Sequence, residues 1–153
     1  MHRIVTEAGY LLSYGFEKLN SQKVLHPFLT LLYATGEQKR ESFQDISYEI
    51  SIPKVINRFH ANDSNADAAI AIYPAEIEEK GVRKPLIIVM LKEYKSNRYL
   101  TIGQHYEVRE GFSIPTLYEL LDFSPSLTDE LRELEQALRN GAENFVTAAT
   151  NSL

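Results

Sequence analysis

Residues 65–96 read "NADAAIAIYPAEIEEKGVRKPLIIVMLKEYKS", and this stretch decides the fold. Two apolar runs flank a charged segment that contains Gly81, and a cluster of turn residues precedes the first run. Apolar runs bounded by turn signals predict β-strands, and the unbroken run Leu86–Leu91 is typical of a strand whose two faces are covered by helices. We therefore expect neighbouring strands at about 67–73 and 86–91, joined by a turn centred at Lys80 or Gly81.

Three helices are expected outside this stretch. Apolar residues at helical spacing predict an amphipathic helix over residues 3–20. Residues 99–109 are expected to form a second helix, which Gly111 would end. A third is expected over about 126–147, with Asp129 three residues after its first serine, as in a capping box.

Two prolines are expected to end strands. Apolar and polar residues alternate over Ile46–Ile52, which predicts a strand that Pro53 ends. Pro74 would end the strand at 67–73 in the same way. Both expectations rest on the missing backbone N–H of proline, which cannot join a ladder of hydrogen bonds.

Other segments complete a predicted α/β fold. Residues 25–33 are short and apolar and fit either a strand or a helix, whereas residues 36–41 are polar and predict a loop. Residues 113–121 predict a further strand, although the "YELLDF" end also fits a helix. The order indicates a mixed central β-sheet flanked by helices, in one domain over 1–153.

Composition excludes several classes of protein and site. The chain has 153 residues and no cysteine, which excludes disulfides, thiolate metal sites and a cysteine nucleophile. Glu7 and Glu17 interrupt the N-terminal segment, and no apolar run approaches the roughly 18 residues that a membrane span requires. We therefore expect a cytoplasmic protein with no membrane partner.

Charge is unevenly distributed along the chain. The net charge is −5, which argues weakly against non-specific attraction to nucleic acid. Between Lys80 and Arg109, however, there are seven basic residues and only two acidic ones, so this segment carries a charge of +5 and the remainder a charge of −10. The segment could form a basic face that meets a phosphate backbone, or simply a set of solvated side chains.

Asp67, Glu93 and Lys95 are the strongest candidates for chemistry. Hydrolysis of a phosphodiester needs a divalent ion held by oxygen ligands, and Mg²⁺ takes one or two protein carboxylates. A lysine beside the ion can stabilise developing charge. A turn centred at Lys80 or Gly81 would place residue 67 opposite residue 93 or 95, about 4.5–5.5 Å away.

These residues resemble the signature of the PD-(D/E)xK nuclease superfamily. Asp67 matches the first acid, and Glu93-Tyr94-Lys95 matches the second motif. "KPLIIVMLKEYKS" is similar to the strand before this motif in Holliday-junction resolvases and in nuclease domains of type I restriction subunits. The resemblance covers about 45–121 and implies a restriction-endonuclease-like fold.

The same resemblance implies roles for further residues. It implies Mg²⁺ as the only cofactor, with Asp67, Glu93 and Glu49 as ligands and Lys95 assisting catalysis, and DNA as substrate. It places four residues at the substrate: Lys92, Arg98, Gln104 and Tyr106. In an alternative alignment Met90 takes the position of the second acid and Lys92 that of the lysine, and the metal ligand is lost.

Two functions from different classes therefore remain open. The first is a Mg²⁺-dependent nuclease that hydrolyses DNA. The second is a catalytically inactive relative that acts as an interaction, accessory or immunity module, with a protein partner or a second copy of the chain.

Overall fold

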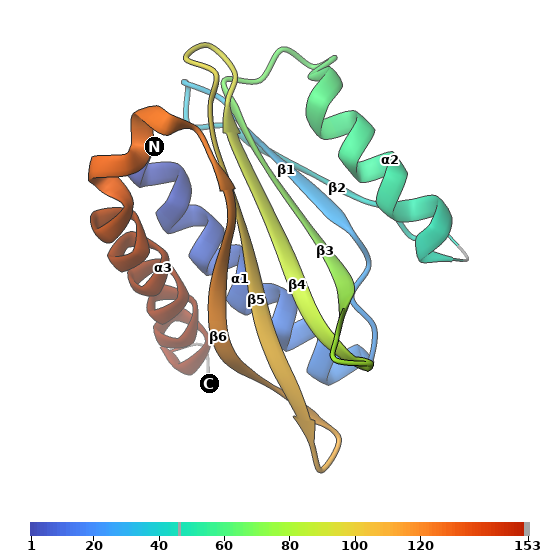
Figure 1. The fold of residues 1–153 in the computed structure, drawn as a ribbon. Helices are drawn as coiled ribbons and strands as arrows, with labels where there is room; N and C mark the ends of the chain where they lie inside the picture. Colours follow the sequence, from blue (N-terminus) through green and yellow to red (C-terminus); the bar gives the residue numbers. More distant parts are fainter. Residues whose placement is uncertain (46, 152–153) are drawn as a thin grey trace.

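The computed structural model describes residues 1–45 and 47–151 and contains six strands and four helical segments (Figure 1). In chain order they are α1 (His2–Gln22), β1 (Phe28–Leu32), β2 (Gln38–Ser42), α2 (Tyr48–Ala61), β3 (Ala68–Glu79), β4 (Val82–Glu93), β5 (Arg98–Arg109), β6 (Phe112–Phe123), the 3₁₀ helix η1 (Pro125–Glu130) and α3 (Leu131–Asn151).

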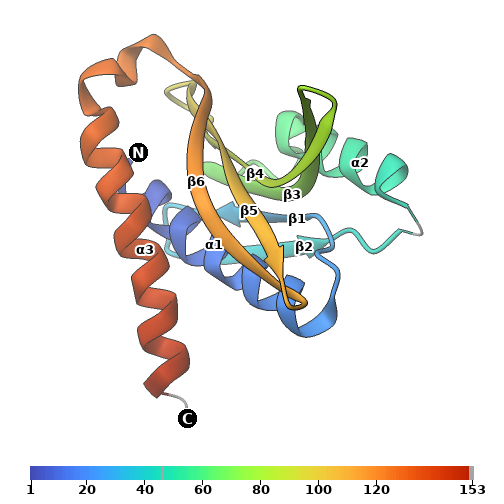
Figure 2. The same cartoon turned by 60° about the horizontal axis from the view of Figure 1, so that its bottom comes forward.

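The strands form one sheet in the order β2-β1-β3-β4-β5-β6, and all five pairings between them are antiparallel. Helices α1 and α3 lie on one face of this sheet and α2 on the other (Figure 2). The α/β class and the flanking helices are as predicted. The expectation of a mixed sheet is wrong for the described residues, because every pair of neighbouring strands is antiparallel.

The hairpin of β3 and β4 confirms the two neighbouring strands predicted from residues 65–96, and both strands are longer than expected. Lys80 and Gly81 form its two-residue turn with φ angles of 52° and 75°, the pair of positive values that a type I′ turn requires. Strand β3 continues through Pro74, contrary to expectation. Its pairing with β1 ends at Ile72, so the proline lies where no ladder bond is needed on that side.

Residues 99–109 form strand β5 rather than the expected helix. Alternate residues of this segment face the core beneath α1, and Gly111 belongs to a second two-residue turn. Glu110 and Gly111 have φ angles of 53° and 83° there. A glycine after an apolar segment can end a helix or close a type I′ turn, and here it does the latter.

The expected strand at Ile46–Ile52 is also wrong, because residues 48–61 form helix α2; residue 46 lies outside the described residues. Ser51, Val55 and Phe59 recur every four residues and are the buried side chains of the helix. Their helical spacing outweighs the alternation over a few residues before Pro53.

Other expectations are confirmed or corrected in detail. Residues 25–33 resolve as strand β1, and residues 113–121 lie within strand β6. The loop expected over 36–41 is instead partly strand β2. The C-terminal helix begins with η1, whose N-cap is Ser124, and no side-chain capping bond is formed there.

Candidate functional site

Asp67 lies directly before β3 and acts as a cap for the loop after β1. Its Oδ2 accepts a hydrogen bond of 2.6 Å from the backbone N–H of Ala34. Its own N–H donates to the carbonyl of Leu32 at 3.0 Å, and its carbonyl accepts from the N–H of Tyr94 at 3.0 Å. These bonds fasten the end of β1 to the start of β3, which is a structural role.

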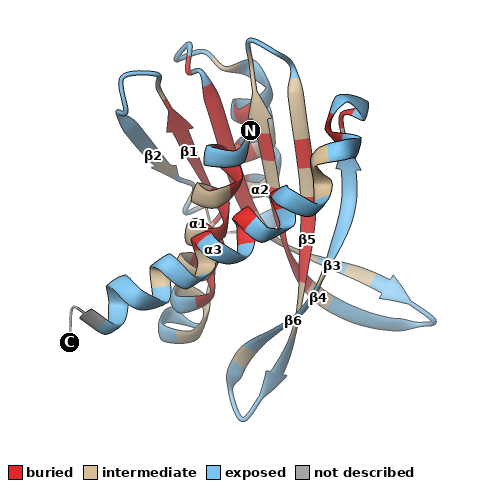
Figure 3. Ribbon diagram, turned by 90° about the vertical axis from the view of Figure 1, so that its left-hand side faces the viewer, coloured by how far each residue is buried: buried red, intermediate tan, exposed pale blue. Residues whose placement is uncertain are grey.

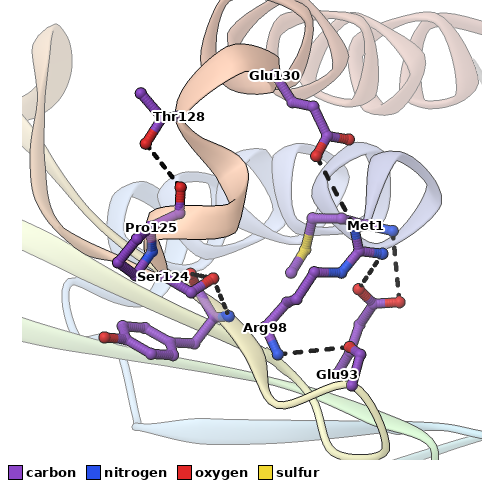
Figure 4. A network of polar contacts seen from close by, with 9 residues as sticks. Met1, Glu93, Arg98, Ser124, Pro125, Thr128 and Glu130 are labelled. Atoms are coloured by element: carbon purple, nitrogen blue, oxygen red, sulfur yellow. Dashed lines mark hydrogen bonds and ion pairs between the residues drawn. The ribbon is translucent and has the colours of Figure 1, made fainter.

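Glu93 is the last residue of β4 and lies in a network of charges beside the start of α1 (Figure 4). Its Oε2 is 3.4 Å from the amino group of Met1, and its Oε1 is 2.7 Å from Nη2 of Arg98. Oε1 makes no hydrogen bond, so the contact with Arg98 is an ion pair without good alignment. Arg98 also approaches Glu130 at 3.8 Å, which links β5 to η1.

The register of the β3–β4 hairpin separates the two acids. Because the turn is centred between Lys80 and Gly81, Glu93 lies opposite Ala68 and Asp67 lies opposite Tyr94. Residues that face each other across a ladder share a face, and successive residues alternate. Glu93 therefore lies on the α1–α3 face. Asp67 lies on the α2 face with Tyr94, whose ring is 6.3 Å from that of Phe59.

Within the described part of the chain, Lys95 and Glu49 form no hydrogen bond or ion pair with either acid. Lys95 is exposed in the turn between β4 and β5, and Glu49 is exposed in the first turn of α2. The prediction that Glu49 lies on the strand preceding Asp67 is wrong, because its segment is helical. The two predicted acids thus do not converge, and Lys95 is paired with neither.

The four residues predicted to contact substrate are divided between the faces. The Lys92 ammonium lies 5.8 Å from the centre of the Tyr94 ring, on the α2 face. Arg98 is in the network with Glu93. Gln104 is 3% exposed and donates to the carbonyls of His105 and Leu117, and Tyr106 packs edge-on against Phe16.

Burial disfavours ionisation of two tyrosines near the predicted site residues, Tyr94 and Tyr106. Burial raises the pKa of Tyr94 to about 12, and the hydroxyl of Tyr94 donates to the backbone carbonyl of Phe59 in α2. Burial also raises the pKa of Tyr106. Both side chains are therefore neutral at physiological pH and act in packing and hydrogen bonding.

The acids do not fit the metal that the resemblance implies. Within residues 1–45 and 47–151, no three or more histidine and carboxylate side chains form a group that could hold an ion. Asp67 and Glu93 face opposite sides of the sheet, and Glu93 is already paired with two cationic groups. Mg²⁺ binding at these residues stays a prediction that the geometry does not favour.

The basic segment is largely neutralised. Four of its seven basic side chains form ion pairs with neighbouring glutamates. The pairs are Arg83–Glu76, Lys84–Glu79, Arg98–Glu93 and Arg109–Glu107. A single basic face for DNA is therefore not favoured.

Sequence reasoning missed an exposed apolar surface on the β5–β6 hairpin. Of the ten large hydrophobic side chains that are exposed in the described residues, six belong to this hairpin. They are Val108, Phe112, Ile114, Leu117, Leu120 and Leu121. Val108 and Leu120 lie on the α1–α3 face, like Tyr106 and Ile102. The other four, Phe112, Ile114, Leu117 and Leu121, lie on the opposite face, and we call these four the hairpin surface. Five of the six lie in β6, and an apolar strand has the same sequence pattern whether its side chains are buried or exposed.

Two hollows adjoin the β5–β6 hairpin. One, of about 360 Å³, lies between β5–β6 and α3, with Leu120 and Tyr118 on one side and Leu131, Leu134 and Leu138 on the other. The second, of about 940 Å³, lies between the ends of the β3–β4 and β5–β6 hairpins and includes Val108 and Leu117 in its lining.

No family model, curated protein or solved structure matches this chain. Among the helices of the described residues, none combines the length and apolar character needed to span a bilayer.

Proposed function

We propose that this chain is a protein-interaction module rather than a metal-dependent nuclease. The observation that supports this most strongly is the concentration of exposed apolar side chains on the β5–β6 hairpin. Exposed apolar side chains that gather on one face of an element mark interaction sites in proteins, whereas single exposed hydrophobic residues do not.

The hairpin surface is large enough to contribute substantially to binding. Leu117 is 63% exposed, Phe112 is 59% exposed, and Leu121 and Ile114 are 43% and 42% exposed. Together this corresponds to about two complete side chains, or on the order of 3–6 kcal/mol if fully buried. Association costs of similar size must be offset, so a partner needs polar or backbone contacts in addition.

The nuclease function stays a prediction, as do membership of the PD-(D/E)xK superfamily, a restriction-endonuclease-like fold, DNA as partner and a cytoplasmic location. The motif Glu93-x-Lys95 supports the nuclease predictions at the level of sequence. The separation of Asp67 from Glu93 and the ion pairs of the basic segment support the interaction module instead.

The proposal is tested by partner capture with matched variants. The tagged protein is incubated with extract of the cells that produce it, and retained proteins are compared with those held by a Phe112→Glu, Ile114→Glu double variant. Val146→Glu on α3 is the control, because Val146 is 60% exposed and lies outside the hairpin. We expect the same partner with the wild type and the control, and its loss with the double variant.

A nuclease assay provides the opposing arm of the test. DNA is incubated with the protein in Mg²⁺ or Mn²⁺, and no cleavage is expected. Cleavage that Asp67→Ala abolishes would contradict the proposed function, as would capture that the double variant leaves unchanged.

A further inference from the structure

Strands β4 and β5 separate before either of them ends. Their pairing runs from Glu93↔Arg98 to Leu86↔His105, yet β4 begins at Val82 and β5 continues to Arg109. Figure 3 shows the two hairpins diverging as exposed arms beyond the buried body of the sheet. The hollow of about 940 Å³ lies between these arms, and we call it the arm cleft.

Pro85 provides a physical reason for the separation. The next pair of the ladder would join Pro85 to Tyr106, and proline has no backbone N–H to donate. No backbone hydrogen bond joins residues 82–85 to residues 106–109 in the described part of the chain. Alternate residues of β5 over 106–109 therefore present N–H and C=O groups to the cleft without a strand opposite them.

The walls of the arm cleft are apolar or carry side chains that are paired with one another. Ile77, Pro85, Val108 and Leu117 supply apolar lining. Lys84 pairs with Glu79 at 3.0 Å and Arg109 with Glu107 at 2.6 Å, and the His105 ring lies 2.9 Å from the Glu119 carboxylate. An uncharged occupant therefore suits this cleft better than a phosphate backbone.

We propose that the arm cleft binds an extended segment of a partner protein, which adds as a β-strand to the inner edge of β5. This proposal rests on the proposed function and specifies how the partner is held. Backbone groups of the segment satisfy those of residues 106–109, and its apolar side chains contact Val108 and Leu117. Main-chain bonds supply affinity in this mode of recognition, and the side-chain contacts supply specificity.

A second copy of the chain is a poorer occupant than a separate protein. Its β2 edge has five residues and carries Lys39, Arg40 and Glu41, the kind of charged short edge that resists pairing. Its β6 edge contains Pro115 and two shifts of register, which also interrupt strand addition. Neither edge of the sheet offers the regular apolar strand that the cleft suits.

The test uses a displayed library of random ten-residue peptides, selected on the intact protein. We expect selected peptides to be rich in apolar residues, free of proline and low in charge. Hydrogen exchange of the wild-type protein is then measured with and without a selected peptide. Binding is expected to slow exchange of backbone amides within 106–109 at least about ten-fold, because newly paired amides exchange only on local opening.

Val108→Glu and Val82→Glu form a matched pair of variants. Both side chains are exposed, at 63% and 57%, but only Val108 lines the arm cleft. We expect Val108→Glu to weaken peptide binding at least about ten-fold, which is about 1.4 kcal/mol, and Val82→Glu to change it less than about two-fold. Circular dichroism and the unfolding midpoint confirm that both variants are folded.

The outcomes separate this inference from the function on which it rests. Selected peptides that leave exchange at 106–109 unchanged, or that respond equally to both variants, overturn the strand-addition proposal, while partner capture by the hairpin surface can still hold. A library that yields no binding peptide, or a protein that fills the cleft by self-association on ultracentrifugation, overturns it as well. Failure of the proposed function itself appears separately, as Asp67-dependent cleavage of DNA.

Discussion

Tyr94 connects the β4 end of the sheet to α2. Its hydroxyl donates to the carbonyl of Phe59, and its backbone N–H donates to the carbonyl of Asp67. The residue lies between Glu93 and Lys95, at the position that opposes Asp67 in the ladder. A single residue of register therefore decides whether this end of the sheet gathers carboxylates or packs a tyrosine against a helix.

Stability at high pH is expected to depend on Tyr94. Its folded-state pKa of about 12 lies above its ordinary value of 10.0, so folding favours the protonated form. The contribution is complete below pH 10 and is lost as the pH rises through 12. Tyr94→Phe cannot ionise, so its loss of stability between those pH values should be smaller than that of the wild type, as measured by urea unfolding.

The same substitution removes a hydrogen bond at neutral pH. Tyr94→Phe is expected to lower the free energy of unfolding at pH 7 by about 1 kcal/mol. Other tyrosines with raised pKa values, such as Tyr73 and Tyr48, still titrate in the variant, so its alkaline loss is reduced rather than abolished. Identical pH profiles for the two proteins would contradict the role given to Tyr94.

At the scale of elements, α3 is fixed by close packing on α1. A Cβ atom added to Gly9 would overlap the carbonyl of Leu138, and one added to Gly141 would overlap the carbonyl of Thr6. The two glycines thus let the helix backbones touch at reciprocal points. Gly141 lies inside α3 at this crossing, rather than ending or bending the helix.

Alanine substitutions test this crossing. Gly9→Ala and Gly141→Ala should each lower the free energy of unfolding by about 1–3 kcal/mol, because the helices must move apart. Gly15→Ala in the same helix is the control, since its nearest neighbour would be a side-chain atom of Leu25 at 3.7 Å. It should be neutral or raise stability by up to about 1 kcal/mol. Equal effects in all three proteins, measured by thermal unfolding, would refute the close crossing.

Elements were predicted correctly from the sequence where the local pattern has only one common structural meaning. The run Leu86–Leu91 and the pair Lys80-Gly81 each have one common structural meaning, and both were predicted. Gly111 has two meanings, and only the partner strand β6 distinguishes a hairpin turn from a helix end. The alternation in Ile46–Ile52 was too short to outweigh Val55 and Phe59, which lie beyond Pro53.

At the scale of the whole molecule, the site prediction depended on the register of the β3–β4 hairpin, which the sequence alone does not determine. The positions of Asp67 and Glu93 along their strands were predicted to within one residue. Their faces depend on whether the turn is centred on a residue or between two residues, and counting along the chain cannot decide this. The hairpin surface and the arm cleft depend on where β4 and β5 separate, which only the assembled sheet reveals.

The central claim is that the register of the β3–β4 hairpin keeps Asp67 and Glu93 on opposite faces and leaves them without a shared ion. Calorimetric titration of Mg²⁺ into the wild type, Asp67→Asn and Glu93→Gln tests it most directly. We expect no saturable heat in any of the three proteins. Stoichiometric, saturable binding to the wild type that each substitution removes would contradict it.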